Sequence, residues 1–251
     1  MRALDAVARL EALAARLDAR AGALEARRDA RCVFTHAYAL MTRRLAAELP
    51  AADLDDAGWV VDLADAFAEK YFSALEAYDR GGEPPAAWQA VFATIGSRRT
   101  SVLEELAFGV YAHIVRDLPH TLREVGLTDA GGRSRLRDHH TVTAIVGRAI
   151  DDVQAAISER YGPYVRALDR IGHRYDEILT NYGIRLSRGM AWYNALRLDD
   201  PRSAASASGA LEESTRVFVA QVMNPPLLSL RAFLRASRWF AALLRRWPKP
   251  T

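Results

Sequence analysis

Apolar residues recur at spacings of three and four along nearly the whole chain, which is the period of an amphipathic α-helix. No segment shows the sustained alternation of apolar and polar residues that is typical of a β-strand. Short clusters of Gly, Pro, Ser, Asn and Asp interrupt the pattern, as expected at turns. The pattern predicts helices over residues 2–29, 31–48, 59–78, 86–94, 101–124, 138–160, 163–182, 184–198, 210–223 and 227–247.

The interruptions between these helices are too short to separate domains. No repeat of roughly 20 to 50 residues is visible, which argues against a solenoid. We therefore expect an all-α fold in which residues 1–251 form one irregular helical bundle of about nine or ten helices. The first helix, within residues 1–29, is a candidate for packing against a second copy of the chain, which would give a homodimer.

The last predicted helix, 227–247, is basic and amphipathic. Seven basic residues and no acidic residue follow Glu213, and five of the arginines fall on one side of this helix, opposite a wide apolar face. One interpretation is peripheral contact with an anionic membrane surface. The other, which the broad apolar face favours, is a helix of the bundle whose arginines face solvent.

The composition narrows the class of protein. Half of the 251 residues are apolar, 26% are charged, and the formal net charge is +3, which is typical of a globular protein and excludes a disordered chain. The single cysteine, Cys32, excludes a disulfide framework and a four-thiolate zinc site. Residues 1–20 lack the apolar core of a secretory signal, and the longest nearly apolar run, 106–115, is shorter than the roughly 20 residues of a membrane-spanning helix. We expect a cytoplasmic protein.

Familiar catalytic motifs are absent, including the phosphate-binding, dinucleotide-binding, nucleophile-elbow and HExxH patterns. The basic residues are not interleaved with aromatic ones in a strand-like platform, so no nucleic-acid partner is expected. One anomaly remains: Asp117 falls near the middle of an apolar helical stripe, and His113 lies four residues before it on the same face.

This spacing places the two side chains about 5 to 6 Å apart at Cβ. The arrangement suits two ligands of one metal, or a carboxylate that orients a histidine acting as a general acid or base. A metal needs further ligands, and His139, which points inward at the start of its helix, is the candidate. We therefore predict His113 and Asp117 as catalytic residues, and His113, Asp117 and His139 as ligands of a divalent metal such as zinc, iron or manganese.

A structural role for Asp117 stays open. Asp117 can cap a helix that begins at Leu118 and Pro119, because proline favours the first helical turn. It can instead pair with Arg188, which lies on the apolar side of its own helix. It must have some partner, because an isolated buried carboxylate costs several kcal/mol. A separate acidic stripe is expected to face solvent: Asp62, Asp65, Glu69 and Glu76.

Residues 112–119, AHIVRDLP, resemble the AHIxxDLP signature of a helical family of unknown function found largely in actinobacteria. Tyr111 and Val115 replace asparagines that we would expect beside the histidine. More loosely, the HxxxD segment is similar to that of all-helical zinc-dependent nucleases and phospholipases, which implies that this geometry can hold a metal. The resemblance to the first family covers roughly residues 29–200 and includes, in the same order, the segments FTHAYALMT, DAFAEKYFSAL, AAWQAVF and RGMAW.

The leading hypothesis is an enzyme of bacterial small-molecule biosynthesis that acts on an apolar or amphipathic molecule, lipid-like or a secondary metabolite, in a pocket between helices. His113 and Asp117 would perform metal-assisted or general acid–base chemistry there. The alternative is a non-catalytic helical protein that binds an apolar ligand, a membrane surface or a partner helix. The two hypotheses differ in whether the pair faces a cavity or filled core. The predicted substrate-binding residues are Tyr71, Tyr111, Arg188 and Trp192.

Overall fold

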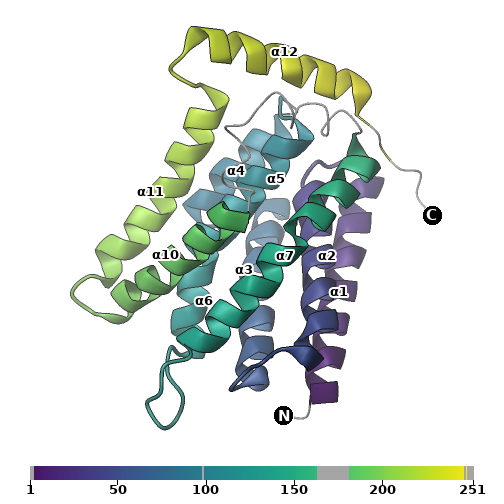
Figure 1. The fold of residues 1–251 in the computed structure, drawn as a ribbon. Coiled ribbons are helices and arrows are strands. Elements are labelled where there is room, and N and C mark those ends of the chain that lie inside the picture. Colours follow the sequence, from purple (N-terminus) through teal and green to yellow (C-terminus); the bar gives the residue numbers. More distant parts are fainter. Residues whose placement is uncertain (1–2, 98, 163–180, 246, 248–251) are drawn as a thin grey trace.

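The computed structural model describes residues 3–97, 99–162, 181–245 and 247 (Figure 1). Within these ranges the chain forms helices and no β-strand, which confirms the all-α prediction. Apart from residues 181 and 182, the helix predicted over 163–182 lies outside the described residues. The helices are α1 (Ala3–Ala26), α2 (Cys32–Glu48), the short 3₁₀ helix η1 (Leu49–Ala51), α3 (Ala57–Asp79), α4 (Ala86–Gly96), α5 (Val102–Tyr111), η2 (Ala112–Asp117), α6 (Leu118–Val125), α7 (Leu136–Tyr161), α10 (Asn181–Asp199), α11 (Ala204–Met223) and α12 (Leu228–Leu244).

Local capping chemistry explains where several helices begin. Asp56 accepts a hydrogen bond from the Trp59 N–H at the start of α3. Ser101 and Glu104 form a reciprocal capping box at the start of α5. In contrast, α11 begins at Ala204, ahead of the predicted start at residue 210. The run that precedes residue 210, AASASG, was predicted to be a loop, but alanine is the strongest helix former.

The helix predicted over 101–124 is interrupted. α5 continues into η2, which is a π-helix, and α6 follows with Pro119 in its first turn. The Leu118 N–H donates to the His113 carbonyl, five residues back instead of four. Pro119 has no N–H and cannot continue the α-helical ladder, which is compatible with a wider turn just before it. π-helical turns occur frequently at functional sites.

α1 forms a hairpin with α2 and also packs against α3 (Figure 1). Its apolar stripe, which includes Leu10, Leu13, Leu17 and Leu24, is buried within the chain. A homodimer formed through this helix stays a prediction. The acidic stripe of α3, predicted to face solvent, is at least partly exposed and pairs at the surface with arginines of α1. The ion pairs are Arg9 with Asp62 and Asp65, Arg16 with Glu69, and Arg20 with Glu76.

Two large apolar clusters fill most of the bundle, one dominated by α2 to α5 and the other by α3, α6, α7 and α10, and a third, small cluster joins α10 to α11. In the first cluster, Gly109 of α5 meets Phe34 of α2. A Cβ atom at Gly109 would lie 2.3 Å from Phe34 Cγ, so only glycine allows the two helices to approach this closely. No helix in the described ranges is both long and apolar enough to cross a membrane.

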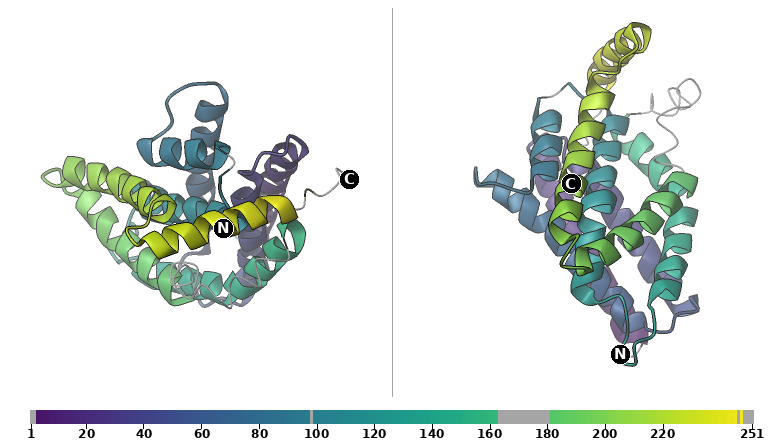
Figure 2. Two further views of the ribbon diagram at one scale, coloured as in Figure 1. Left: turned by 90° about the horizontal axis from the view of Figure 1, so that it is seen from above. Right: turned by 90° about the vertical axis from the view of Figure 1, so that its left-hand side faces the viewer.

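α12 crosses one end of the bundle (Figures 1 and 2). Arg238 pairs with Glu104 at 2.8 Å and also donates to the Val222 carbonyl near the end of α11, while Arg245 pairs with Glu105 at 2.7 Å. Both carboxylates are buried, and burial raises the pKa of Glu105 to about 7 even though Arg245 lowers it. These two arginines were expected to face solvent. They instead attach the helix to the start of α5, which favours the bundle interpretation of this segment.

We expect Arg238→Met to lower the free energy of unfolding by about 3 kcal/mol, because it leaves the Glu104 carboxylate buried without its cation. Arg235→Met is the matched control, since Arg235 lies on the same helix and is exposed. Urea unfolding of both variants checks this expectation. Equal midpoints for the two variants would show that the ion pair does not attach α12.

Candidate functional site

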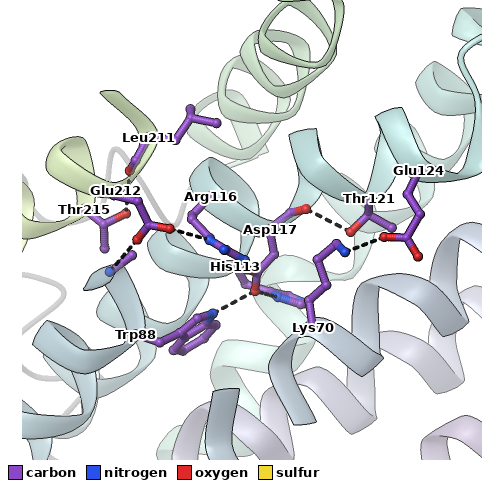
Figure 3. Close-up of polar contacts among 11 residues, drawn as sticks. Lys70, Trp88, His113, Arg116, Asp117, Thr121, Glu124, Leu211, Glu212 and Thr215 are labelled. Atoms are coloured by element: carbon purple, nitrogen blue, oxygen red, sulfur yellow. Dashed lines mark hydrogen bonds and ion pairs between the residues drawn. The ribbon is translucent and has the colours of Figure 1, made fainter. Parts of the chain in front are cut away.

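His113 and Asp117 are both buried, and both lie on η2 (Figure 3). His113 Nδ1 lies 2.9 Å from Asp117 Oδ2. Because a carboxylate only accepts hydrogen bonds, Nδ1 carries the proton and donates it, and Nε2 of the neutral ring keeps its lone pair. The contact predicted from the four-residue spacing is therefore formed.

Asp117 accepts two further hydrogen bonds (Figure 3). Trp88 Nε1 donates to Oδ2 at 2.8 Å, and Arg116 Nη1 donates to Oδ1 at 2.9 Å. The prediction that Asp117 has a partner is confirmed. Asp117 also stands at the predicted N-cap position of a helix that begins at Leu118 and Pro119, but its side chain makes no capping hydrogen bond. The predicted pairing with Arg188 is wrong, because the cationic partner of Asp117 is Arg116.

A second carboxylate ties this centre to neighbouring helices. Glu212 of α11 accepts from Arg116 Nε at 2.9 Å and from the Ala87 N–H at 2.7 Å, at the start of α4 (Figure 3). Arg116 directly precedes Asp117 in the sequence, and this position alone indicated that it could pair with that carboxylate. Trp88 and Glu212 lie far from the pair in sequence, so no local pattern pointed to them.

Aromatic rings surround the His113 imidazole. Phe67 stacks on it with ring centroids 3.5 Å apart, and Tyr38 meets it edge-on at 4.6 Å. Burial lowers the pKa of His113 below its ordinary value of 6.5, although the hydrogen bond and the charge of Asp117 oppose this shift. The ring is therefore neutral at pH 7, with Nε2 as an acceptor.

His113, but not Asp117, lies at the wall of a cavity of about 140 Å³. The cavity is bordered by residues of both large apolar clusters, and most of its wall is aliphatic or aromatic. An engineered apolar cavity of similar size, roughly 150 Å³, takes up benzene. The wall residues are Phe34, Ala37, Tyr38, Met41, Thr42, Leu45, Val60, Leu63, Ala64, Phe67, Leu106, Val110, His113, Ile114, Leu118, Val142, Val146, Ile150, Val153, Gln154, Ile184 and Arg188.

Two polar atoms of the wall residues are buried without a hydrogen-bond partner among the described residues: His113 Nε2 and the Tyr38 hydroxyl. Burial raises the pKa of Tyr38 well above 10, so its hydroxyl stays protonated. Arg188 lies on the same wall, and its charge lowers the pKa of both Tyr38 and His113. Three polar groups from α2, η2 and α10 therefore act on one another across a mainly apolar space.

Of the four predicted substrate-binding residues, the cavity wall includes Arg188 but not the other three. Tyr71 is buried in the first apolar cluster, where its hydroxyl bonds to Thr35 Oγ1 at 2.5 Å. Tyr111 stacks on Phe218, and its hydroxyl bonds to Ser214 of α11. Trp192 packs against His139. Each of these side chains is engaged in contacts between helices.

His139 does not join the His113–Asp117 pair. Its Nε2 donates to the Arg188 carbonyl at 3.0 Å, and burial lowers its pKa to about 3, which keeps the ring neutral. The searched part of the chain holds no group of three or more His, Cys, Asp or Glu side chains arranged to bind a metal. The three predicted ligands are therefore not gathered, because Asp117 faces hydrogen-bond donors and His139 faces α10. A bound metal stays an untested prediction.

Fold and site together define an all-α protein with a buried histidine–aspartate pair beside an apolar cavity. The chain belongs to a family of unknown function, DUF5995, whose model matches residues 10–225. This match confirms the expectation of such a family, whereas the AHIxxDLP signature and the likeness to zinc-dependent nucleases stay predictions. No curated protein and no solved structure matches the chain. The matched range contains the cavity wall and ends before α12.

We expect the His113 ring to titrate below pH 6.5 and to remain the Nδ1–H tautomer at pH 7. Asp117→Asn should lower this pKa further, because it removes the carboxylate that favours the protonated ring. Two-dimensional ¹H–¹⁵N NMR of the imidazole across pH reports both the tautomer and the pKa. An unchanged or higher pKa in the variant would contradict the assigned contact.

Substitutions of Asp117 and His113 should have different effects on the free energy of unfolding. Asp117→Asn presents an amide to the donors of Trp88, Arg116 and His113, and should cost about 1 to 3 kcal/mol of unfolding free energy. His113→Leu should leave stability nearly unchanged or raise it, because functional sites retain polar groups at the expense of stability. Parallel urea unfolding measures both. A loss in His113→Leu as large as in Asp117→Asn would indicate that His113 is structural.

Proposed function

We propose that this protein is an enzyme that binds a small, largely apolar molecule in the cavity and transfers a proton with His113. One observation carries the proposal: a neutral imidazole is fixed by a carboxylate at Nδ1, and its Nε2 has no hydrogen-bond partner among the described residues and belongs to a wall residue of an apolar cavity. Most buried polar atoms have a hydrogen-bond partner. His120 Nε2 and His139 Nδ1 are also buried without a partner among the described residues, but neither residue lines the cavity, whereas His113 does.

The surroundings of His113 suit a general base. The Asp117 carboxylate fixes the tautomer and would stabilise the imidazolium that forms when Nε2 accepts a proton. Arg116 and Trp88 hold that carboxylate in turn, so the orientation of the imidazole does not depend on the ligand. The stacked Phe67 ring restricts rotation of the imidazole. A base held in this way needs little reorganisation at the moment of proton transfer.

A non-catalytic binding protein is the second candidate. The observation that favours it is the wall itself, where aliphatic and aromatic side chains outnumber polar ones. Such a cavity gains binding free energy from apolar contact alone. In this case His113 would only orient a bound molecule by accepting a hydrogen bond. The two candidates share the ligand site and differ in proton transfer.

The test uses 5-nitrobenzisoxazole, a small aromatic compound that opens when a base removes its carbon-bound proton and its N–O bond breaks. We expect the protein to accelerate this reaction at pH 7, and His113→Gln to lower the rate about 100-fold, because the base is lost. The rate should fall only below pH 6.5, since the pKa of His113 is lowered. Absorbance of the released cyanophenolate measures the reaction.

His120→Gln is the matched control, because His120 lies in the helix that follows η2 but not on the cavity wall. It should leave the rate unchanged. Binding of the compound without a rate above buffer would support the binding protein instead. A rate that survives in His113→Gln would contradict the assigned base.

A further inference from the structure

Arg188 is the most unusual charge in the described structure. It lies on α10 with 5% of its surface exposed and forms part of the cavity wall. Its Nε donates to Thr143 Oγ1 at 2.9 Å, but no carboxylate among the described residues pairs with it. Burial lowers its pKa to about 10, so the guanidinium is still charged at pH 7.

Other buried or half-buried arginines of this protein show how unusual that is. Arg116, Arg238 and Arg245 each contact a carboxylate within 3 Å. Arg31 contacts both Asp29 and Asp79. A buried charge without a partner costs several kcal/mol. Among the described residues, Arg188 is therefore a buried cation at the cavity without a counter-charge, whereas Arg31, Arg116, Arg238 and Arg245 each contact a carboxylate.

The groups near Arg188 are also available to a ligand. The Tyr38 hydroxyl is protonated and has no partner among the described residues, and it lies within electrostatic range of the guanidinium. Nε donates to Thr143, and the two Nη groups have no hydrogen-bond partner among the described residues. This planar pair of groups matches the two oxygens of a carboxylate.

We infer that the molecule bound in this cavity is an apolar carboxylate, with its charge on Arg188 and a further hydrogen bond from Tyr38. The inference rests on the proposed function and names its ligand class. Arg188 supplies one positive charge in a mainly apolar wall, so it can balance one negative charge of a ligand. A phosphate monoester carries nearly two negative charges at pH 7 and would leave part of its charge buried without a partner.

The experiment compares three probes that share a phenyl ring and differ in the group attached to it: benzoate, benzamide and toluene. We expect the wild-type protein to bind benzoate about ten- to hundredfold more tightly than benzamide at pH 7, because only benzoate neutralises the guanidinium. Arg188→Met should abolish this preference and still bind toluene. Titration calorimetry or ligand-observed NMR gives the affinities.

A second readout distinguishes a ligand-binding arginine from a structural one. Without ligand, Arg188→Met should melt about 2 to 4 °C above the wild type, because an uncompensated buried cation is removed. A structural arginine would give the opposite sign. Arg185→Met is the control, since Arg185 is exposed on the same helix, and it should retain the preference for benzoate.

The outcomes separate this inference from the proposed function. If toluene and benzamide bind and benzoate binds no more tightly, the inference is overturned while the cavity remains a ligand site. If no probe binds the wild type, the proposed function fails and the inference fails with it. A preference for benzoate that persists in Arg188→Met, or a lower melting temperature of that variant, also overturns the inference.

If Arg188→Met does not fold, the same binding measurements are made on Tyr38→Phe instead. It removes one donor and keeps the ring, so benzoate affinity should fall about threefold or more while toluene affinity stays the same. An equal loss for the two probes would overturn the inference.

Discussion

A carboxylate without solvent contact can remain charged inside a protein only if donors surround it, and Asp117 imposes this constraint on the centre of the bundle. Its partners come from α4 through Trp88, and from η2 itself through Arg116 and His113. Arg116 in turn requires Glu212 of α11, which also caps the start of α4. One buried charge thereby fixes how three separate segments meet. The apolar clusters supply the bulk of the packing, but they do not by themselves define this arrangement.

The polar groups in and near the cavity fall into two sets, those with hydrogen-bond or charge partners within the protein and those without. Asp117, Arg116 and Glu212 satisfy one another, and their network is closed within the protein. His113 Nε2 and the Tyr38 hydroxyl have no partner among the described residues, and Arg188 has no counter-charge there. The closed network orients His113, and the open groups remain free to meet a ligand. This division is typical of sites in which a rigid polar support holds a few reactive or binding atoms.

The helices could be predicted from the sequence because apolar spacing and capping residues are local properties. The anomaly of Asp117 was also visible, since a carboxylate interrupts an apolar stripe. Its partner Trp88 was not, and neither was Glu212, which pairs with Arg116, because both approach only through packing between helices. The same limit applies to the acidic stripe of α3, whose arginine partners lie more than 50 residues earlier in the chain. Arg188 was recognised as buried, but whether it faces a carboxylate or a cavity depends on the position of α10.

The π-helical turn has a consequence for the geometry of everything that follows it. A turn closed by a bond to the fifth residue back contains one residue more than an α-helical turn. That extra residue rotates α6 by about 100° around the common axis relative to a continuous helix. Leu118 and Leu122 reach the core in this rotated phase. Loss of a single residue between His113 and Asp117 would allow a regular α-helix in which Leu118 and Leu122 keep this phase, but it would shorten the His113–Asp117 spacing from four residues to three. The wide turn therefore accommodates the four-residue spacing of the pair while α6 keeps its apolar face toward the core.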